Sequence, residues 1–592
     1  MTSHEPSATP AASGSGTLPA TSAGADLVLR NARIFTGELA QPHAEALAAS
    51  NGRIMAIGQE ADVARLIGPG TRVVDALGRR VIPGLNDSHI HLIRGGVNYL
   101  LELRWDGVPS LSMALQMLRE QSERTPPGQW VRVVGGWSGI QFSERRLPTV
   151  SELNRAAPDT PVLVLHLYQS AILNRAAVAA LGYTKETPDP PGGQIVRDHA
   201  GNPTGVLLAM PAPFILYGAL GRLPVLDPDQ QLSSTRHFFR ELNRYGITSA
   251  IDAAGGSQQF PDNYAAVMQL AESGQLSVRI AYHLLPQTAG EELQELSRWV
   301  ETMRIGDGNE WLRLNGAGEA LTLSSVDFEN FCEPQPELPE AALEQVEQAV
   351  SILVSNDWGF RLHASYGETI DRFLGIFDRL ATDGLFPNGN RWFFDHAETV
   401  SPRSLERIAA LGGGVSIQNR TMFQSQPFLD RHGPGIAGHS PPIRTMLDAG
   451  LTVAAGSDAT RAASYNPWLS LSWLVTGRDI ADRTFRTEPH LVDRATALRM
   501  YTRAGAELSG EADMKGTLSP GKFADFAILS ADYFEVDESD ISRIESVLTV
   551  VGGAVVWSSA EFEGLAPPLP APSPDWSPVT KFGGAHREPT LA

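Results

Sequence analysis

The sequence is poor in cysteine and in basic residues, and it contains no long apolar run. Cys332 is the single cysteine among 592 residues, which excludes an intrachain disulfide framework and a metal site built from thiolates. Lys and Arg total 47 against 67 Asp and Glu, for a formal net charge of -20, whereas a nucleic-acid partner needs clustered basic residues. No run of about 18 apolar residues occurs, so we expect no membrane span.

Hydrophobic residues make up 42% of the chain, enough for a large core, but both ends differ from the rest. Residues 1–25 are mostly Ser, Thr, Ala, Gly and Pro, without the apolar core of a secretory signal. We expect a disordered tail there and cytoplasmic residence by default. Residues 563–592 are rich in proline and predict either a loose tail or an extended arm lying on a neighbour.

Short strands are predicted near both ends of the chain. In residues 26–78, a strand comes first and a hairpin follows around Asn51-Gly52, a strong turn signal. Residues 513–562 contain three further short strands, the last two separated by Gly552-Gly553. The two segments together predict one small composite β-sandwich domain, with a larger domain inserted between them.

Residues 79–512 alternate apolar strands with helical patterns. One such helix is predicted over 339–355, and another begins at Ser401-Pro402, a favourable cap and first-turn pair. Parallel strands need crossover helices, so this alternation favours an α/β fold, a (β/α)8 TIM-like barrel. The pattern gives more than eight strands, and we assign residues from about 130 to 210 to an insertion in the barrel.

The segment Pro83-Gly84-Leu85-Asn86-Asp87-Ser88-His89-Ile90-His91 carries the strongest chemical signal. The period of a strand places His89 and His91 on the same side, where two imidazoles can hold a divalent cation. Two polar side chains satisfied within the fold would give the same pattern. Three further groups end predicted strands, where barrel enzymes place catalysis, although each alone also fits a capped turn: His363, His396 and Asp458.

These motifs resemble those of the amidohydrolase superfamily, in its amidohydrolase-3 or YtcJ-like branch. The resemblance covers nearly all of residues 26–560. It rests on PGLNDSHIH at 83–91, GGW at 135–137, GSDAT at 456–460, NPW at 466–468 and LSPGKFADFAIL at 518–529.

The resemblance implies a barrel with a composite β domain and a divalent metal as cofactor. It implies that His89, His91, His363 and His396 bind metal, and that Asp458 is both ligand and general base. Zinc suits imidazole and oxygen donors, while the ligand types also allow Mn, Fe or Co. Many relatives self-associate, so a homodimer is an expectation as well.

Two positions depart from the pattern of the family. Many relatives bridge two metals with a carboxylated Lys or a Glu on the fourth strand, and this region has no Lys. Glu319 could bridge as an oxygen donor; as a surface carboxylate it would leave a single metal. Gln169 stands where a His is common. The predicted substrate-contacting residues are Trp137, Tyr168, Gln169 and Trp468, and for the three aromatic ones core packing is an equal alternative.

The expected function is metal-dependent hydrolysis of an amide-type C–N bond in a small molecule, by metal-activated water with Asp458 as base. Formamide deformylation is a known activity of similar proteins. One alternative is deamination of an aminated heterocycle. Related deaminases carry His-x-x-Glu after the fifth strand, whereas here Tyr366 takes the place of that Glu after His363. The other alternative is a metal-free scaffold protein.

Overall fold

The computed structural model describes residues 24–256, 258–328, 331, 337–386 and 391–586. The tail expected over residues 1–25 therefore lies almost entirely outside the described residues. No helix within these ranges is long and apolar enough to cross a membrane.

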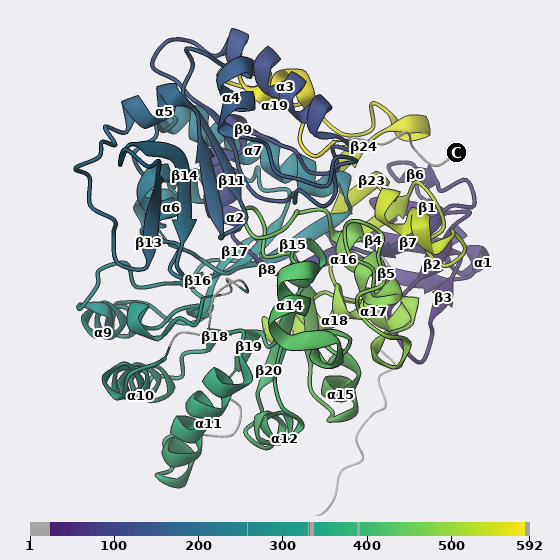
Figure 1. Ribbon diagram of the computed structural model, residues 1–592. Helices are drawn as coiled ribbons and strands as arrows, with labels where there is room; N and C mark the ends of the chain where they lie inside the picture. Colours follow the sequence, from purple (N-terminus) through teal and green to yellow (C-terminus); the bar gives the residue numbers. More distant parts are fainter. Residues whose placement is uncertain (1–23, 257, 329–330, 332–336, 387–390, 587–592) are drawn as a thin grey trace, which may run out of the picture.

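A parallel sheet forms a barrel in the middle of the chain (Figure 1). Among the described residues it has eight strands, in the order β21-β20-β19-β18-β17-β16-β15-β8. The ring closes where the backbone N–H groups of Ser457 and Asp458 donate to the carbonyl of His89, at 3.1 and 2.8 Å. The predicted (β/α)8 barrel is confirmed. Its strands are β8 (Leu85–Ile90), β15 (Ile247–Asp252), β16 (Arg279–Leu284), β17 (Leu312–Ala317), β18 (Phe360–Ala364), β19 (Trp392–His396), β20 (Gly414–Gln418) and β21 (Val453–Gly456).

Helices cover the outside of the barrel, and their sequences explain their positions. One face of α10 is apolar at helical spacing, and it buries Leu343, Val346, Val350 and Leu353. At the start of α12, the Ser401 hydroxyl accepts the N–H of Ser404, as predicted for that cap. Neighbouring helices on this side are α9 (Glu292–Thr302), α10 (Glu340–Val354), α11 (Gly367–Thr382) and α12 (Pro402–Ala410).

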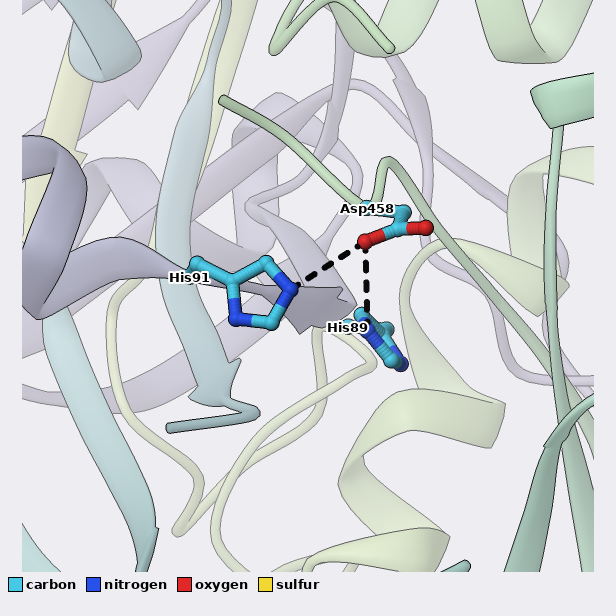
Figure 2. Close-up of side chains that lie close together, drawn as sticks. All are labelled: His89, His91 and Asp458. Atoms are coloured by element: carbon cyan, nitrogen blue, oxygen red, sulfur yellow. Dashed lines mark ion pairs between the residues drawn. The ribbon is translucent and has the colours of Figure 1, made fainter. Parts of the chain in front are cut away.

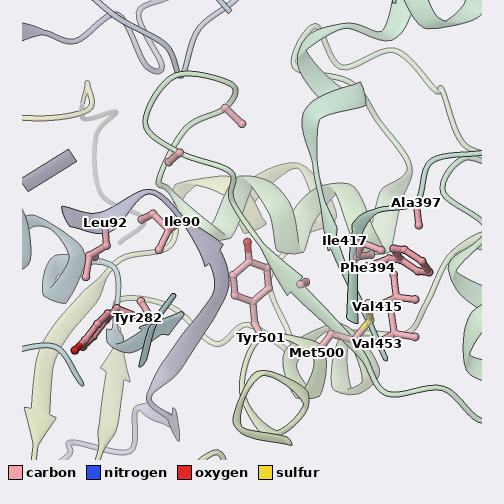
Figure 3. Packing of buried hydrophobic residues seen from close by; sticks show 14 of the residues in the cluster. Ile90, Leu92, Tyr282, Phe394, Ala397, Val415, Ile417, Val453, Met500 and Tyr501 are labelled. Atoms are coloured by element: carbon pink, nitrogen blue, oxygen red, sulfur yellow. The ribbon is translucent and has the colours of Figure 1, made fainter. Parts of the chain in front are cut away.

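A hydrophobic core lies between the barrel strands and the helices outside them (Figure 3). Phe394 of β19 stacks there on Phe373 and Phe377 of α11. Phe394 of β19 lies beside Val415 and Ile417 of β20, and all three side chains are fully buried. Burying one such side chain contributes about 1.5–3 kcal/mol, so the strands hold their places through packing on both faces. This rigid frame fixes where each strand ends, and with it the positions of the side chains at the mouth of the barrel.

Both ends of the chain contribute to a second domain. Its six-stranded sheet has the order β24-β23-β22-β7-β2-β3, in which β7 pairs with the N-terminal β2 and the C-terminal β22. A four-stranded sheet, β5-β4-β1-β6, shares its buried cluster, so the two sheets enclose one core. The strands are β1 (Leu27–Arg30), β2 (Arg33–Phe35), β3 (His43–Ala44), β4 (Ala46–Ser50), β5 (Arg53–Gly58), β6 (Arg72–Asp75), β7 (Arg80–Pro83), β22 (Phe526–Leu529), β23 (Ser546–Val551) and β24 (Ala554–Ser558).

Two boundaries differ from those expected from the sequence. We expected residues from 79 onward to belong to the barrel, yet β7 lies in the composite sheet, and the first barrel strand, β8, begins at Leu85. The insertion sheet, of order β13-β14-β12-β11-β10-β9, begins at Glu102, earlier than residue 130. Its strands are β9 (Glu102–Leu103), β10 (Val131–Val133), β11 (Val162–His166), β12 (Ser170–Leu173), β13 (Gly193–Arg197) and β14 (Pro203–Ala209), between α2 (Leu92–Asn98) and α7 (Pro228–Arg244).

The proline-rich C-terminal segment packs on its own chain. The Ser577 hydroxyl, which precedes α19 (Pro578–Phe582), donates to the carbonyl of Leu100 at 2.6 Å. The N–H of His586 donates to the carbonyl of Asp106 at 2.9 Å. In Figure 1 this segment lies beside α3 (Leu111–Arg124). Residues 563–586 are therefore held against the insertion and the barrel, in place of the loose tail or the arm on a neighbour that composition alone suggested.

Candidate metal centre

The mouth of the barrel gathers the six residues predicted from the sequence as metal ligands. They lie on or just after five barrel strands, with both His89 and His91 at the end of β8, and the carboxyl ends of parallel strands meet at one face. His89 lies in β8, and His91 is the residue that precedes α2. The other members come from β17 through β21: Glu319, His363, His396 and Asp458.

Asp458 lies between the two histidines of the first motif (Figure 2). Its Oδ1 atom is 3.2 Å from Nε2 of His91 and 3.5 Å from Nε2 of His89. All three side chains are almost completely buried. Their donor atoms lie within 4.8 Å of one another, a spacing that could hold one metal ion.

Glu319 faces imidazoles on both sides with its two carboxylate oxygens. The Oε2 atom lies 3.2 Å from Nε2 of His89, 3.8 Å from Nδ1 of His363 and 3.9 Å from Nε2 of His396. The Oε1 atom lies 3.8 Å from Nε2 of His91. His89, Glu319 and His396 form a second group whose donors lie within 4.8 Å. The two groups share His89, and the Oε1 atom of Glu319, a member of the second group, faces His91 of the first.

In three of the four imidazoles, the nitrogen that points away from the centre has its own acceptor; the Nδ1 atom of His396 is buried without one among the described residues. Nδ1 of His91 contacts the carbonyl of Ala254. Nδ1 of His89 lies 2.9 Å from Oδ1 of Asp395, and Nε2 of His363 lies 3.3 Å from Oδ1 of Asp327. Such acceptors fix the tautomer and present the other nitrogen to a metal.

Sequence reasoning missed Asp395 and Asp327, which support the ligands from behind. Asp395 directly precedes His396 on β19, so a carboxylate inside an apolar strand was the available signal. It also pairs with the buried Arg361, whose Nε lies 2.7 Å from its Oδ2. Asp327 is in a loop and accepts the N–H groups of Ser365 and Tyr366. No pattern near Asp327 distinguishes it in the sequence.

The donor set fits a divalent cation. Nε2 of His89, Oε2 of Glu319 and Oδ2 of Asp458 are buried without a well-formed hydrogen bond among the described residues. Burying polar atoms in this way is costly unless another partner binds them. Imidazoles combined with carboxylates are the ligands that zinc and similar metals take in proteins.

The electrostatics of the centre also call for positive charge. Burial alone would raise the pKa of Asp458 and of Glu319, but His89 and His91 hold both well below their usual range. Burial alone would lower the pKa of His89, but Asp395 and Glu319 raise it well above its usual value. The carboxylates are therefore ionised and need a compensating cation, which protonated imidazole or a metal can provide.

A cavity of about 450 Å³ opens over these ligands. Tyr168 lines it, and so do Tyr217 and Phe328, which sequence reasoning did not single out. Three predicted contact residues lie elsewhere. The buried indoles of Trp137 and Trp468 donate to the carbonyls of Leu165 and Tyr245, and Gln169 donates to Gln424 while lining a different cavity.

Fold and site together define a class of enzyme. The sequence profile of the amidohydrolase family matches residues 72–557, and the chain belongs to this family. It is a metal-dependent hydrolase. The chain is similar to the N-substituted formamide deformylase of Arthrobacter pascens, at 24% identity over 90% of this chain and 98% of that protein. It is also similar to the putative amidohydrolase YtcJ of Bacillus subtilis, at 26% identity over 83% and 92% of the two chains.

Solved structures share the fold at lower identity. An uncharacterized metal-dependent hydrolase from Pyrococcus horikoshii has a TM-score of 0.62 and 20% identity, over 87% of this chain and 99% of that one. The atrazine chlorohydrolase of Arthrobacter aurescens, crystallised with zinc, has a TM-score of 0.51 and 16% identity, over 92% and 97%. At such identities the likeness shows the fold alone.

Proposed function

We propose that this enzyme hydrolyses an amide-type C–N bond in a small N-substituted amide or formamide, with one or two divalent ions, zinc by preference, as cofactor. The observation that carries the proposal is the convergence of buried donor atoms from His89, Glu319 and Asp458 that have no well-formed hydrogen bond to any described residue. The similarity to an N-substituted formamide deformylase supports the substrate class.

Five of the six side chains form two groups of donor atoms, each of which could bind a metal ion, and His363 lies beside one of them. His89, His91 and Asp458 form one group of donors, and His89, Glu319 and His396 form the other. His363 adds its Nδ1 atom on the side of Glu319. When bound, a divalent cation acidifies water and polarises a carbonyl group.

Asp458 is the proposed general base. Its Oδ1 faces the two histidines, while its Oδ2 is buried, lies 3.8 Å from Nε of Arg420 and makes no well-formed hydrogen bond within the part of the chain that the structure describes. A carboxylate held ionised in this position can accept a proton from the attacking water and pass it to the leaving nitrogen. The C–O bond forms, the C–N bond breaks, and the products are a carboxylic acid and an amine.

The cavity over the ligands is the proposed substrate site. Tyr168 and Tyr217 line one side of it, their ring centroids 5.7 Å apart, and Phe328 adds a further aromatic surface. Tyr168 is thereby the predicted substrate-contacting residue best placed for that role. Trp137, Gln169 and Trp468 do not line this cavity and would affect the substrate only through the packing of neighbouring residues.

Metal analysis and a substrate panel test the proposal together. Purified protein should retain about one or two metal ions per chain and hydrolyse members of an amide and formamide panel. His89→Ala and Asp458→Asn should abolish hydrolysis while leaving the circular dichroism spectrum unchanged. Asp448→Asn, at a side chain that is 69% exposed, is the matched control and should behave as wild type.

Other outcomes of the same experiment lead elsewhere. Full activity of either site variant would refute the assigned roles. Ammonia release from an aminated heterocycle, without amide hydrolysis, would favour a deaminase. Protein that binds no metal and turns over no substrate would favour the scaffold alternative. The homodimer and cytoplasmic residence stay predictions, to be checked by light scattering and by cell fractionation.

A further inference from the structure

A second cavity, of about 920 Å³ and partly open to solvent, adjoins the metal centre. Tyr217 lines both cavities. The adjoining cavity also receives Arg94, one helical turn after His91, and Arg461, three residues after Asp458. One turn of α2 advances about 5.4 Å, so the elements that present the metal ligands also present these guanidinium groups.

The charged lining of this cavity is unbalanced. It contains three arginines, Arg94, Arg132 and Arg461, and one carboxylate, Glu102. Glu102 already forms an ion pair with Arg104. Within the described residues, none of the three arginines has a carboxylate oxygen within 4.0 Å. The cavity therefore carries excess positive charge.

The guanidinium groups of Arg94 and Arg132 are poorly satisfied for their degree of burial, whereas Arg461 is only partly buried. Arg94 and Arg132 are each 5% exposed. Nε and Nη1 of Arg94, and Nε of Arg132, are buried without hydrogen-bond partners among the described residues. The bonds they do make are to neutral acceptors: Nη2 of Arg94 donates to the hydroxyl of Tyr168 at 3.2 Å, and Nη2 of Arg132 to the carbonyl of Pro224 at 2.6 Å.

Arg461 repels both Arg94 and Arg132, while Tyr168 and Tyr217 raise the pKa of Arg94 above its usual value against the effect of burial. Burial, together with Arg94, lowers the pKa of Arg461, and burial lowers the pKa of Arg132 to about 10. All three remain protonated at neutral pH. Buried like charges with free donors are unfavourable unless an anion binds, and a carboxylate matches the planar fork of a guanidinium.

The rest of the lining indicates which kind of anion. Val97, Val134, Leu223 and Leu226 form apolar walls beside the arginines. Such walls suit the hydrocarbon part of an organic acid better than a hydrated inorganic ion. Tyr217 lines both cavities, and α2 and the loop after β21 present both metal ligands and arginines. An anion bound by the arginines would therefore lie beside the metal ligands.

We propose that Arg94, Arg132 and Arg461 bind a carboxylate group of the substrate, so that the enzyme prefers N-substituted amides or formamides that carry an acidic group away from the C–N bond. This inference rests on the proposed function for the identity of the scissile bond. The anion site itself rests only on the arginines and their surroundings.

Binding and turnover test the two parts separately. In the binding arm, calorimetry compares butanoate with butanamide on the metal-loaded wild type, on Arg461→Gln and on Arg119→Gln. Arg119 is exposed on α3 and is the matched control. Butanoate should bind wild type and the control equally, and Arg461→Gln at least about tenfold more weakly, while butanamide should show no such difference. A carboxylate held by the metal alone would not depend on Arg461.

In the turnover arm, N-butylformamide is compared with its analogue that ends in a carboxylate in place of the terminal methyl. Wild type should show the higher kcat/KM for the acidic compound. Arg461→Gln should lower the ratio of kcat/KM for the acidic compound to kcat/KM for the neutral compound about tenfold, while Arg119→Gln keeps the wild-type ratio.

Each failure has its own signature. Equal butanoate binding by wild type and Arg461→Gln would overturn the anion site. Arginine-dependent binding without preference for the acidic substrate would identify a site for a free anion and overturn the substrate assignment. If neither formamide is hydrolysed while butanoate binding still depends on Arg461, the proposed function fails and the anion site stands.

Discussion

Oδ1 of Asp395 lies 2.9 Å from Nδ1 of His89, and both side chains are fully buried. The same carboxylate pairs with Arg361. Asp395 therefore fixes the orientation of a ligand from behind while neutralising a buried cation. Its role in positioning can be separated from a direct role in metal binding, because it faces the nitrogen turned away from the centre.

Asp395→Asn should weaken metal binding. Losing the charged acceptor lowers the basicity of His89 and loosens its ring, and changes of this kind cost about 10–100-fold in metal affinity. Chelator competition followed by elemental analysis measures the effect. Asp448→Asn serves as the control, and unchanged affinity in Asp395→Asn would show that the contact does not position His89. Thermal unfolding should also report lower stability, because Arg361 loses its buried counterion.

Glu319→Gln tests whether the Glu319 carboxylate, which faces histidines of both donor groups, is a metal ligand. An amide is a much weaker metal donor than the ionised carboxylate, so the variant should retain less metal per chain after dialysis than wild type. Glu310→Gln, at a side chain that is 47% exposed, is the matched control. Equal metal content in Glu319→Gln and wild type would place the metal elsewhere or show that the histidines and Asp458 suffice.

Trp468→Phe distinguishes a core residue from a substrate contact. The indole nitrogen donates to the carbonyl of Tyr245 at 3.1 Å, and the ring packs against Tyr533. Losing this hydrogen bond should lower the free energy of unfolding by about 1 kcal/mol and leave KM unchanged. Denaturant titration and steady-state kinetics measure the two quantities. A large rise in KM at unchanged stability would instead assign Trp468 to the substrate site.

His166 should make stability depend on pH. Burial lowers its pKa to about 4, and its Nε2 has no hydrogen-bond partner among the described residues. The unfolded chain, with a pKa of about 6.5, binds the proton first, so the folded state loses stability as pH falls from about 6.5 toward 4. His166→Phe removes this dependence. The difference in unfolding free energy between wild type and variant should shift by about 2 kcal/mol between pH 7 and 4.5, measured with denaturant. A constant difference would contradict the effect of burial.

The sequence predicts those parts of the molecule that depend on local pattern. Strand period and the position of His89 and His91 beside a strand are visible without coordinates, and so is the apolar stripe of α10. Asp395 and Asp327 escaped prediction because their function depends on imidazoles that are distant in the chain. The early start of the insertion was missed because β9 has only two residues, too few to show a period.

The aromatic residues show a different limit of sequence reasoning. Trp468 and Tyr168 look equally suited to a pocket, yet the first packs in the core and the second lines the cavity over the ligands. Tertiary packing decides between these outcomes, and hydrophobicity alone does not. The three arginines of the adjoining cavity come from α2, β10 and the loop after β21, so only the folded chain brings them together.

The contacts of Ser577 and His586 bear on how the protein is handled. Cutting the chain near residue 566 would remove the donors that the carbonyls of Leu100 and Asp106 accept. It would also remove the carbonyl of Trp576, which accepts from the side chain of Gln121. A shortened expression product of this kind would expose these polar groups along the insertion without their partners in the chain. Affinity tags are better fused to the amino end.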